Sequence, residues 1–119
     1  MTKRQYKNEK WYKTSSENNL HFLDIIPYCS GVYAIFIKKI RSKIYQLSYI
    51  GSSISIKKRI LSYNFENYTY GGGINTKFGQ IQDVIIKFKT VKEYGKWLMD
   101  EAKLINRLNP ELNKYFKLK

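Results

Sequence analysis

The stretch that decides the fold runs from Gly31 to Gly51 and reads GVYAIFIKKIRSKIYQLSYIG. It contains two runs rich in β-branched and aromatic residues, 32–37 and 44–50, separated by the basic segment 38–43. Two such runs joined by a short polar segment predict an antiparallel β-hairpin with a solvated loop.

The chain continues beyond the hairpin with a helix and a third strand. Ser55 is a favoured N-cap residue, and a helical pattern follows it over residues 56–63. Three consecutive glycines, 71–73, predict a loop, with room for one helical turn near residues 76–78. The apolar run 84–89 predicts the third strand.

The last predicted helix has a start signal and a stop signal. Thr90 and Glu93 form a Thr-x-x-Glu capping box, and Pro110 disfavours helix at the residue before it, which places the helix over 91–108. The predicted order is β-β-α-(α)-β-α. This is an α+β fold in which helices flank a small three-stranded antiparallel sheet.

The length of 119 residues supports one domain. Residues 30–119 are expected to form it. Residues 1–29 are expected to form a basic and polar arm that leads into the core. The beginning of this arm is either a poorly ordered terminus or a short helix docked through Trp11.

The composition is strongly basic. Lys and Arg number 22 against 9 Asp and Glu, which gives a formal charge of +13, and 11 Tyr accompany them. Such an excess predicts attraction to polyanions, with nucleic acid first and an anionic membrane surface second. An AT-rich genome would explain part of the Tyr and Lys count, but not the shortage of acidic residues.

The cysteine and histidine counts and the lack of a long apolar run exclude zinc-finger, disulfide-bonded and membrane-spanning proteins. A single cysteine, Cys29, and a single histidine, His21, exclude a zinc-finger ligand set and an internal disulfide. No apolar run approaches the ~20 residues of a membrane span, and no signal peptide is recognisable. A soluble, intracellular protein is therefore expected.

Glu101 is the most informative single residue. On a helical wheel at about 100° per residue it lies inside the apolar arc that contains Trp97 and Ile105. A carboxylate in that position must be desolvated, paired or metal-bound, because an unpaired buried charge is unfavourable. The structural alternative is a buried salt bridge to Arg59 or to a lysine.

Two tyrosines lie in the hairpin strands, each close to a glycine. Tyr33 follows Gly31 by two residues, and Tyr49 precedes Gly51 by two. Glycine allows a ligand or another backbone to approach closely, as a phosphodiester would require. Either tyrosine alone would be assigned to the core or the sheet surface.

A group of polar residues after the hairpin could hold a phosphate. Arg59 could contact two oxygens of one phosphate with its guanidinium. Hydroxyl groups and free N–H groups at the start of a helix also favour an anion. The predicted phosphate-binding or DNA-binding residues are Gly51, Ser52, Ser53, Lys57 and Lys58.

Taken together, these residues resemble the core of the GIY-YIG nuclease superfamily, spelled here Gly31-Val32-Tyr33 and Tyr49-Ile50-Gly51. The resemblance covers about residues 31–113. It extends to Arg59, Tyr63, Glu101 and Asn113. The position of Tyr63 is His in many homing-type members, so the chain looks more like the excision-repair nuclease branch and some restriction enzymes.

The resemblance implies a metal-dependent DNA endonuclease, a hydrolase whose products carry 5′-phosphate and 3′-hydroxyl ends. Glu101 would hold Mg²⁺ or Mn²⁺. Arg59 would neutralise charge in the transition state. Asn113 would position Glu101 or a phosphate oxygen.

The resemblance also implies roles for three tyrosines. Tyr33 would accept a proton from the attacking water, which requires positive charge nearby to lower its ordinary pKa of about 10. Tyr49 and Tyr63 would orient the water and the phosphate, or share the proton-acceptor role.

The implied partner is DNA, with no membrane, and the chain is expected to be a monomer without DNA. Its setting could be homing or genome interference by a phage or mobile element, restriction, or repair. The first alternative is a non-catalytic nucleic-acid-binding protein that retains the fold. The second is a small interaction protein or inhibitor with an acidic partner, which only the charge supports.

Overall fold

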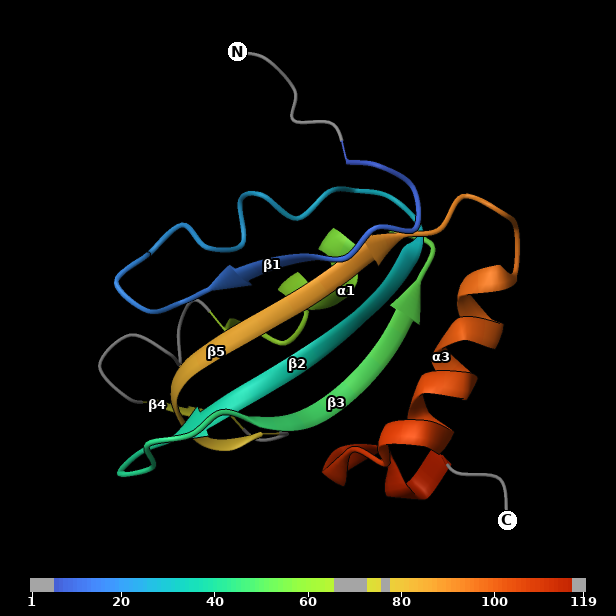
Figure 1. Cartoon of the computed structure of the whole chain (residues 1–119). Coiled ribbons are helices and arrows are strands. Elements are labelled where there is room, and N and C mark those ends of the chain that lie inside the picture. Colours follow the sequence, from blue (N-terminus) through green and yellow to red (C-terminus); the bar gives the residue numbers. More distant parts are fainter. Residues whose placement is uncertain (1–5, 66–72, 76–77, 117–119) are drawn as a thin grey trace.

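The computed structural model describes residues 6–65, 73–75 and 78–116. The elements follow one another along the chain as shown in Figure 1. They are β1 (Tyr12–Ser15), β2 (Gly31–Lys39), β3 (Gln46–Ser53), α1 (Ile56–Leu61), β4 (Gly73–Asn75), β5 (Gly79–Thr90), α3 (Lys96–Leu108) and the 3₁₀ helix η1 (Glu111–Phe116). The predicted α+β class is confirmed. The turn predicted near residues 76–78 lies mostly outside the described residues.

The strands form one antiparallel sheet with the order β1-β5-β2-β3, and β4 pairs with the beginning of β5. The three predicted strands are β2, β3 and β5. The predicted hairpin is confirmed, with Tyr33 of β2 opposite Gly51 of β3. The prediction of three strands is wrong, because the described residues contain five.

The N-terminal segment is part of this sheet. β1 pairs with β5, with Tyr12 opposite Phe88, so the segment at this point is neither a disordered terminus nor a helix. Phe22, Leu23 and Ile26 are at most 2% exposed and belong to the main core. The segment before residue 30 thus supplies one strand and several core side chains. β1 was not predicted, because its four residues, YKTS, show no alternation of apolar and polar side chains.

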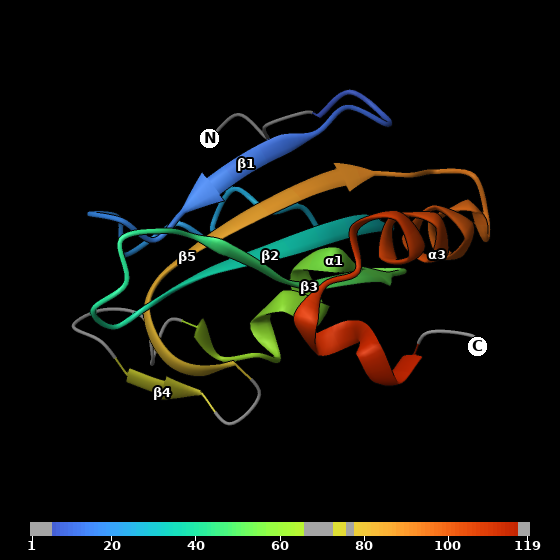
Figure 2. The same cartoon turned by 60° about the horizontal axis from the view of Figure 1, so that its bottom comes forward.

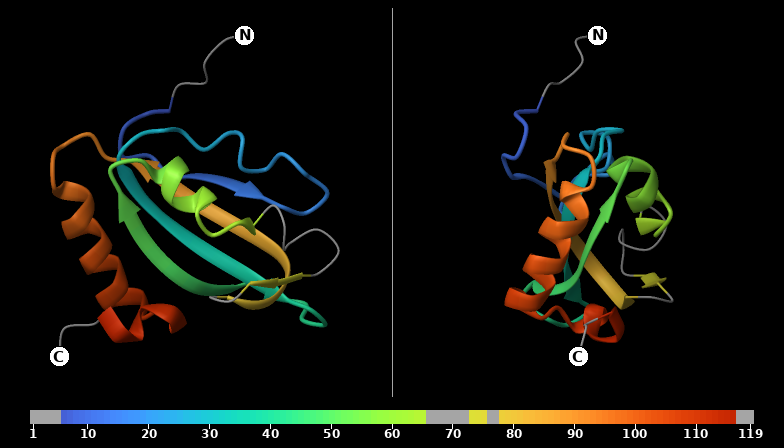
Figure 3. Two further views of the ribbon diagram at one scale, coloured as in Figure 1. Left: turned by 180° about the vertical axis from the view of Figure 1, so that it is seen from behind. Right: turned by 90° about the vertical axis from the view of Figure 1, so that its right-hand side faces the viewer.

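The sheet is covered on both faces, which explains why β2 is apolar from Val32 to Ile37. Tyr33 and Ile35 pack with Ile56 and Ile60 of α1. Val32 and Ala34, on the opposite face, pack with Trp97 and Ile105 of α3. The α1 helix and the α3 helix accordingly lie on opposite sides of β3 (Figure 2 and Figure 3, right).

The helices begin and end for different reasons. The side chain of Ser55 accepts a hydrogen bond from the main-chain N–H of Lys58, which confirms the predicted cap of α1. The α3 helix ends at Leu108, as predicted.

Among the described residues, neither helix has the length and apolar character needed to cross a bilayer.

The predicted start of the last helix is wrong. Thr90 is the final residue of β5, and α3 begins five residues later than predicted, at Lys96 after Gly95 with φ 80°. Val91 is fully buried, and its N–H donates to the carbonyl of Ser30. Burial and sheet-like pairing of this segment therefore prevail over the local capping signal.

Candidate active site

Most of the predicted catalytic residues lie around β3, the edge strand of the sheet. This strand is the last of the sheet order, so its outer edge has no neighbouring strand among the described residues. Tyr49 belongs to the core cluster on the α1 side. Ile50 belongs to the cluster on the α3 side, and Ser52, two residues further, contacts Glu101 of α3. Side chains from both faces of the sheet thus approach the same edge.

The glycines of the hairpin make room for parts of the protein itself. A Cβ atom on Gly51 would lie 2.4 Å from both Cζ and Oη of Tyr33. A Cβ atom on Gly31 would lie 2.1 Å from the carbonyl oxygen of Lys89. The expectation that these glycines open space for a ligand is therefore replaced by a structural reason: Gly51 accommodates the Tyr33 ring, and Gly31 accommodates the β5 backbone.

Three tyrosines form one cluster on the α1 side of the edge. The hydroxyl oxygens of Tyr33 and Tyr63 are 2.7 Å apart and share a hydrogen bond. The ring centroid of Tyr49 lies 6.4 Å from that of Tyr33 and 6.1 Å from that of Tyr63. All three side chains are buried, the Tyr33 ring most completely at 1% exposure.

Arg59 connects this cluster to solvent. It lies on α1, four residues before Tyr63, and its side chain is exposed. Electrostatic interaction with Tyr63 and a hydrogen bond to Tyr33 raise the pKa of Arg59. A permanent cation with several N–H donors is thereby held beside the tyrosine hydroxyls.

Burial is the main influence on the protonation state of Tyr33 and Tyr49. Burial raises the pKa of Tyr33 far above its ordinary value, Tyr63 and Tyr49 raise it further, and Arg59 opposes the rise. Burial, with Tyr63 and Glu101, raises the pKa of Tyr49 to about 12. The predicted proton-acceptor role of Tyr33 needs the opposite shift. In these surroundings Tyr33 is a neutral hydroxyl that donates and accepts hydrogen bonds.

Glu101 reaches the edge from the α3 side. The hydroxyl of Ser52 donates a 2.9 Å hydrogen bond to its Oε1. Burial raises the pKa of this carboxyl, while the Ser52 hydrogen bond and the charge of Arg59 lower it. Within the described residues Glu101 forms no ion pair, so the alternative of a buried salt bridge is not found there. A half-buried carboxylate without a direct ion-pair partner is unfavourable.

The donor set around Glu101 fits a magnesium ion that is shared with a phosphate. Mg²⁺ keeps several waters and is commonly held by one or two carboxylates together with substrate phosphates. The carboxylate of Glu101 and the hydroxyl oxygen of Ser52 are hard oxygen donors on neighbouring elements. In the described part of the chain no group of three or more Asp, Glu, His or Cys side chains gathers, so a closed all-protein metal site is not found there.

Asn113 has a different place from the one predicted. Its Oδ1 accepts a 2.8 Å hydrogen bond from the N–H of Ile50, and its Nδ2 donates a 2.9 Å bond to the Ile50 carbonyl. The side chain is 2% exposed. It therefore pairs with the free edge of β3 as a neighbouring strand would, and it positions the strand instead of contacting Glu101.

The predicted phosphate-binding residues have different environments. The ammonium of Lys57 is 2.6 Å from the Leu23 carbonyl, to which it donates, and the hydroxyl of Ser53 accepts from the Ser55 N–H, so these two residues have structural contacts. Gly51 accommodates the Tyr33 ring, and Ser52 contacts Glu101. Lys58 is exposed next to Arg59, where it could contact a phosphate.

Ser52 is the residue whose role the sequence analysis missed. It is expected there to bind phosphate, whereas in the structure it is the hydrogen-bond partner of Glu101. The signal for this role is the period of two along a strand, which places Ser52 on the same face as the apolar Ile50 and hence under α3.

Comparison with models of known protein families gives no match to the chain, and comparison with curated proteins gives none either.

Proposed function

We propose that this chain is a metal-dependent endonuclease of the GIY-YIG type that hydrolyses DNA phosphodiester bonds. One observation carries the proposal: Glu101 with Ser52 and Arg59 with the tyrosine cluster approach one strand edge from opposite faces. The charge of Arg59 lowers the pKa of Glu101, and the charge of Glu101 raises that of Tyr49, so the two halves are electrostatically coupled. A carboxylate, a guanidinium and hydroxyl groups around one open edge suit phosphoryl chemistry.

The side chains have distinct roles in this proposal. Glu101 and Ser52 would hold Mg²⁺ or Mn²⁺, which when bound supplies a Lewis acid at the scissile phosphate. Arg59 binds non-bridging phosphate oxygens and offsets the charge that develops on them. Tyr49 and Tyr63 orient the phosphate and the attacking water.

Tyr33 acts indirectly. Its hydroxyl is bonded to that of Tyr63 and stays neutral, because burial raises its pKa. We assign to Tyr33 the positioning of Tyr63 in place of the proton transfer that the family resemblance implies.

A non-catalytic nucleic-acid-binding protein with the same fold is the second candidate. The observation that favours it is the burial of the tyrosines, since Tyr33, Tyr49 and Tyr63 are 1%, 7% and 9% exposed. In that case Arg59 and Lys58 would contact phosphate and the carboxylate would have no chemical role.

The test is a supercoiled-plasmid assay with Glu101→Gln and the matched control Glu93→Gln, whose parent side chain is exposed on the surface. The parent and the control should nick the plasmid when Mg²⁺ is added, and Glu101→Gln should not. DNA binding in EDTA should be alike in all three. Absence of cleavage by the parent with Mg²⁺ or Mn²⁺, together with salt-sensitive binding, would support the second candidate.

A further inference from the structure

A second groove lies on the α3 side of the sheet, away from the tyrosine cluster. It has a volume of about 320 Å³, at the lower end of the range for small-molecule sites. Phe36, Ile50 and Leu104 form its apolar lining, Trp11 forms one wall, and Lys87 and Arg107 lie at its rim. We refer to it as the Trp11 groove.

The groove exists because α3 covers only part of this face. Trp97 and Ile105 of α3 are buried against β2 and β3. Two of the lining residues are more exposed: Trp11 is 40% exposed and Leu108 is 47% exposed. Large apolar side chains that gather on an open surface commonly mark a binding site.

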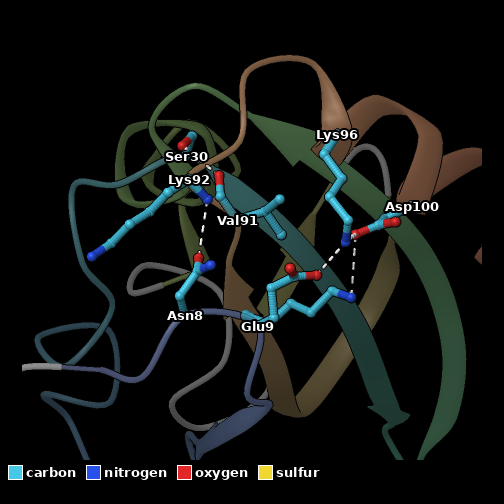
Figure 4. A network of polar contacts seen from close by, with 8 residues as sticks. Asn8, Glu9, Ser30, Val91, Lys92, Lys96 and Asp100 are labelled. Atoms are coloured by element: carbon cyan, nitrogen blue, oxygen red, sulfur yellow. Dashed lines mark hydrogen bonds and ion pairs between the residues drawn. The ribbon is translucent and has the colours of Figure 1, made fainter.

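The Trp11 wall is held in place by a polar network that links the N-terminal segment to α3 (Figure 4). Lys96 pairs with Glu9 and lies 3.1 Å from Asp100, and Asn8 accepts a hydrogen bond from the N–H of Lys92. Lys89 lies 3.3 Å from Asp100, and its ammonium is 5.4 Å from the centre of the Trp11 ring. This arrangement preorganises the wall, which reduces the entropy lost when a ligand binds.

The rim carries free positive charge. The ammonium of Lys87 lies 5.1 Å from the centre of the Phe36 ring. In the described part of the chain, neither Lys87 nor Arg107 forms an ion pair with an acidic side chain. Aromatic faces next to unpaired cations are the combination that single-stranded nucleic acids require, since bases stack on the rings and phosphates contact the cations.

We propose that the Trp11 groove binds an unpaired base of a single-stranded nucleic acid segment. The base stacks on Trp11 over the apolar lining, and the adjoining phosphates contact Lys87 and Arg107. Ile50 lies two residues before Ser52, and Leu104 three residues after Glu101, so the groove is on the same face of the sheet as the carboxylate. The inference rests on the proposed function only for the class of partner.

The experiment measures binding of a fluorescein-labelled oligothymidylate of about ten nucleotides in EDTA, by fluorescence anisotropy at several salt concentrations. Trp11→Leu should raise Kd on the order of tenfold, because leucine keeps the apolar contact and loses the stacking face. Trp11→Phe should restore part of the affinity. Arg107→Gln should weaken binding and reduce the salt slope by about one. The matched control is Lys103→Gln, an exposed cation on α3 that does not line the groove.

A direct readout does not depend on these variants. Trp97 is 8% exposed, so in a Trp97→Phe background the emission comes from Trp11 and should be quenched by the oligothymidylate. Three results would each overturn the proposal. The first is Trp11 emission that the oligothymidylate does not quench, and the second is an equal Kd for Trp11→Leu and for the Lys103→Gln control. The third is tighter binding of an acidic peptide of similar charge than of the oligothymidylate. A plasmid assay with Trp11→Leu tests the groove proposal separately from the proposed function. This variant should still nick plasmid, because its candidate active site is intact.

Discussion

At the residue scale, burial disfavours the charged form of Glu101. Burial is the largest cause of its raised pKa, and neither Ser52 nor Arg59 reverses the shift. A carboxyl whose pKa is raised by folding stabilises the fold while it is protonated, below its unfolded pKa. That contribution is lost as the pH rises through the folded pKa.

Glu101→Gln should therefore raise the melting temperature at about pH 7.5 relative to the parent. The difference should shrink at about pH 3.5, where the parent carboxyl is protonated as well. Glutamine keeps the size of the side chain and can still accept the hydrogen bond from Ser52. Thermal unfolding at both pH values is the measurement, with Glu93→Gln as control. A melting temperature of the Gln variant below that of the parent at neutral pH would contradict the assignment.

Tyr33 illustrates how burial changes a predicted role at the same scale. Tyr33→Phe removes the 2.7 Å contact with Tyr63 and the hydrogen bond with Arg59. Stability should fall by about 1–2 kcal/mol, since each hydrogen bond contributes about 1 kcal/mol net. The cleavage rate should also fall, while the pH–rate profile keeps its shape because the Tyr33 hydroxyl does not titrate in that range. Loss of the basic limb in this variant would restore the proton-acceptor role. Tyr94→Phe, at an exposed position, is the control.

At the scale of elements, β3 is an edge strand whose main chain is hydrogen-bonded at one residue by a side chain in place of a neighbouring strand. Asn113 of η1 makes two hydrogen bonds to Ile50, one residue before Gly51. A free strand edge presents unpaired N–H and C=O groups that invite association with other chains. Asn113 closes the edge at Ile50, beside the part of the strand that carries Gly51 and Ser52.

Asn113→Leu should leave both main-chain groups of the buried Ile50 without this partner. Each such group costs about 1–3 kcal/mol, so the free energy of unfolding should fall by about 2–6 kcal/mol in urea titrations. Asn106→Leu, on the exposed face of α3, should change it by less than about 0.5 kcal/mol. A loss no larger than that of the control would show that the edge does not depend on Asn113.

At the scale of the whole molecule, the charge and the single candidate site determine how duplex DNA would be cut. The described residues contain one half-buried carboxylate at the β3 edge and one arginine beside it. One site makes one incision, and the two strands of a duplex run in opposite directions. A charge of +13 on each copy opposes self-association in the absence of DNA.

The protein should therefore be a monomer in solution and should nick supercoiled plasmid first. Linear product should appear later, or only at high enzyme concentration. A time course on plasmid, together with the mass from light scattering, checks both points. A stable dimer without DNA that gives linear product with no nicked intermediate would contradict this expectation, since it would require a self-complementary interface.

The sequence by itself determined the elements whose signals are local. The hairpin follows from two β-rich runs and a polar connection, and the α1 cap follows from Ser55, whose side chain reaches an N–H three residues away. The end of α3 follows from Asn109, which adopts φ 50°, and from Pro110 after it. Within the apolar stripe of α3, the position of Glu101 was also readable from helical periodicity.

The tertiary structure decided what depends on contacts between distant residues. β1 joins the sheet because β5 offers it an edge, and the capping signal at Thr90 fails because the buried Val91 continues the path of β5. The bond between Tyr33 and Tyr63, and that between Ser52 and Glu101, join residues 30 and 49 positions apart. Local propensity carries no information on such pairs. Burial of Tyr33 and Tyr49, which raises the pKa of both hydroxyls, exists only once helix and sheet have packed together.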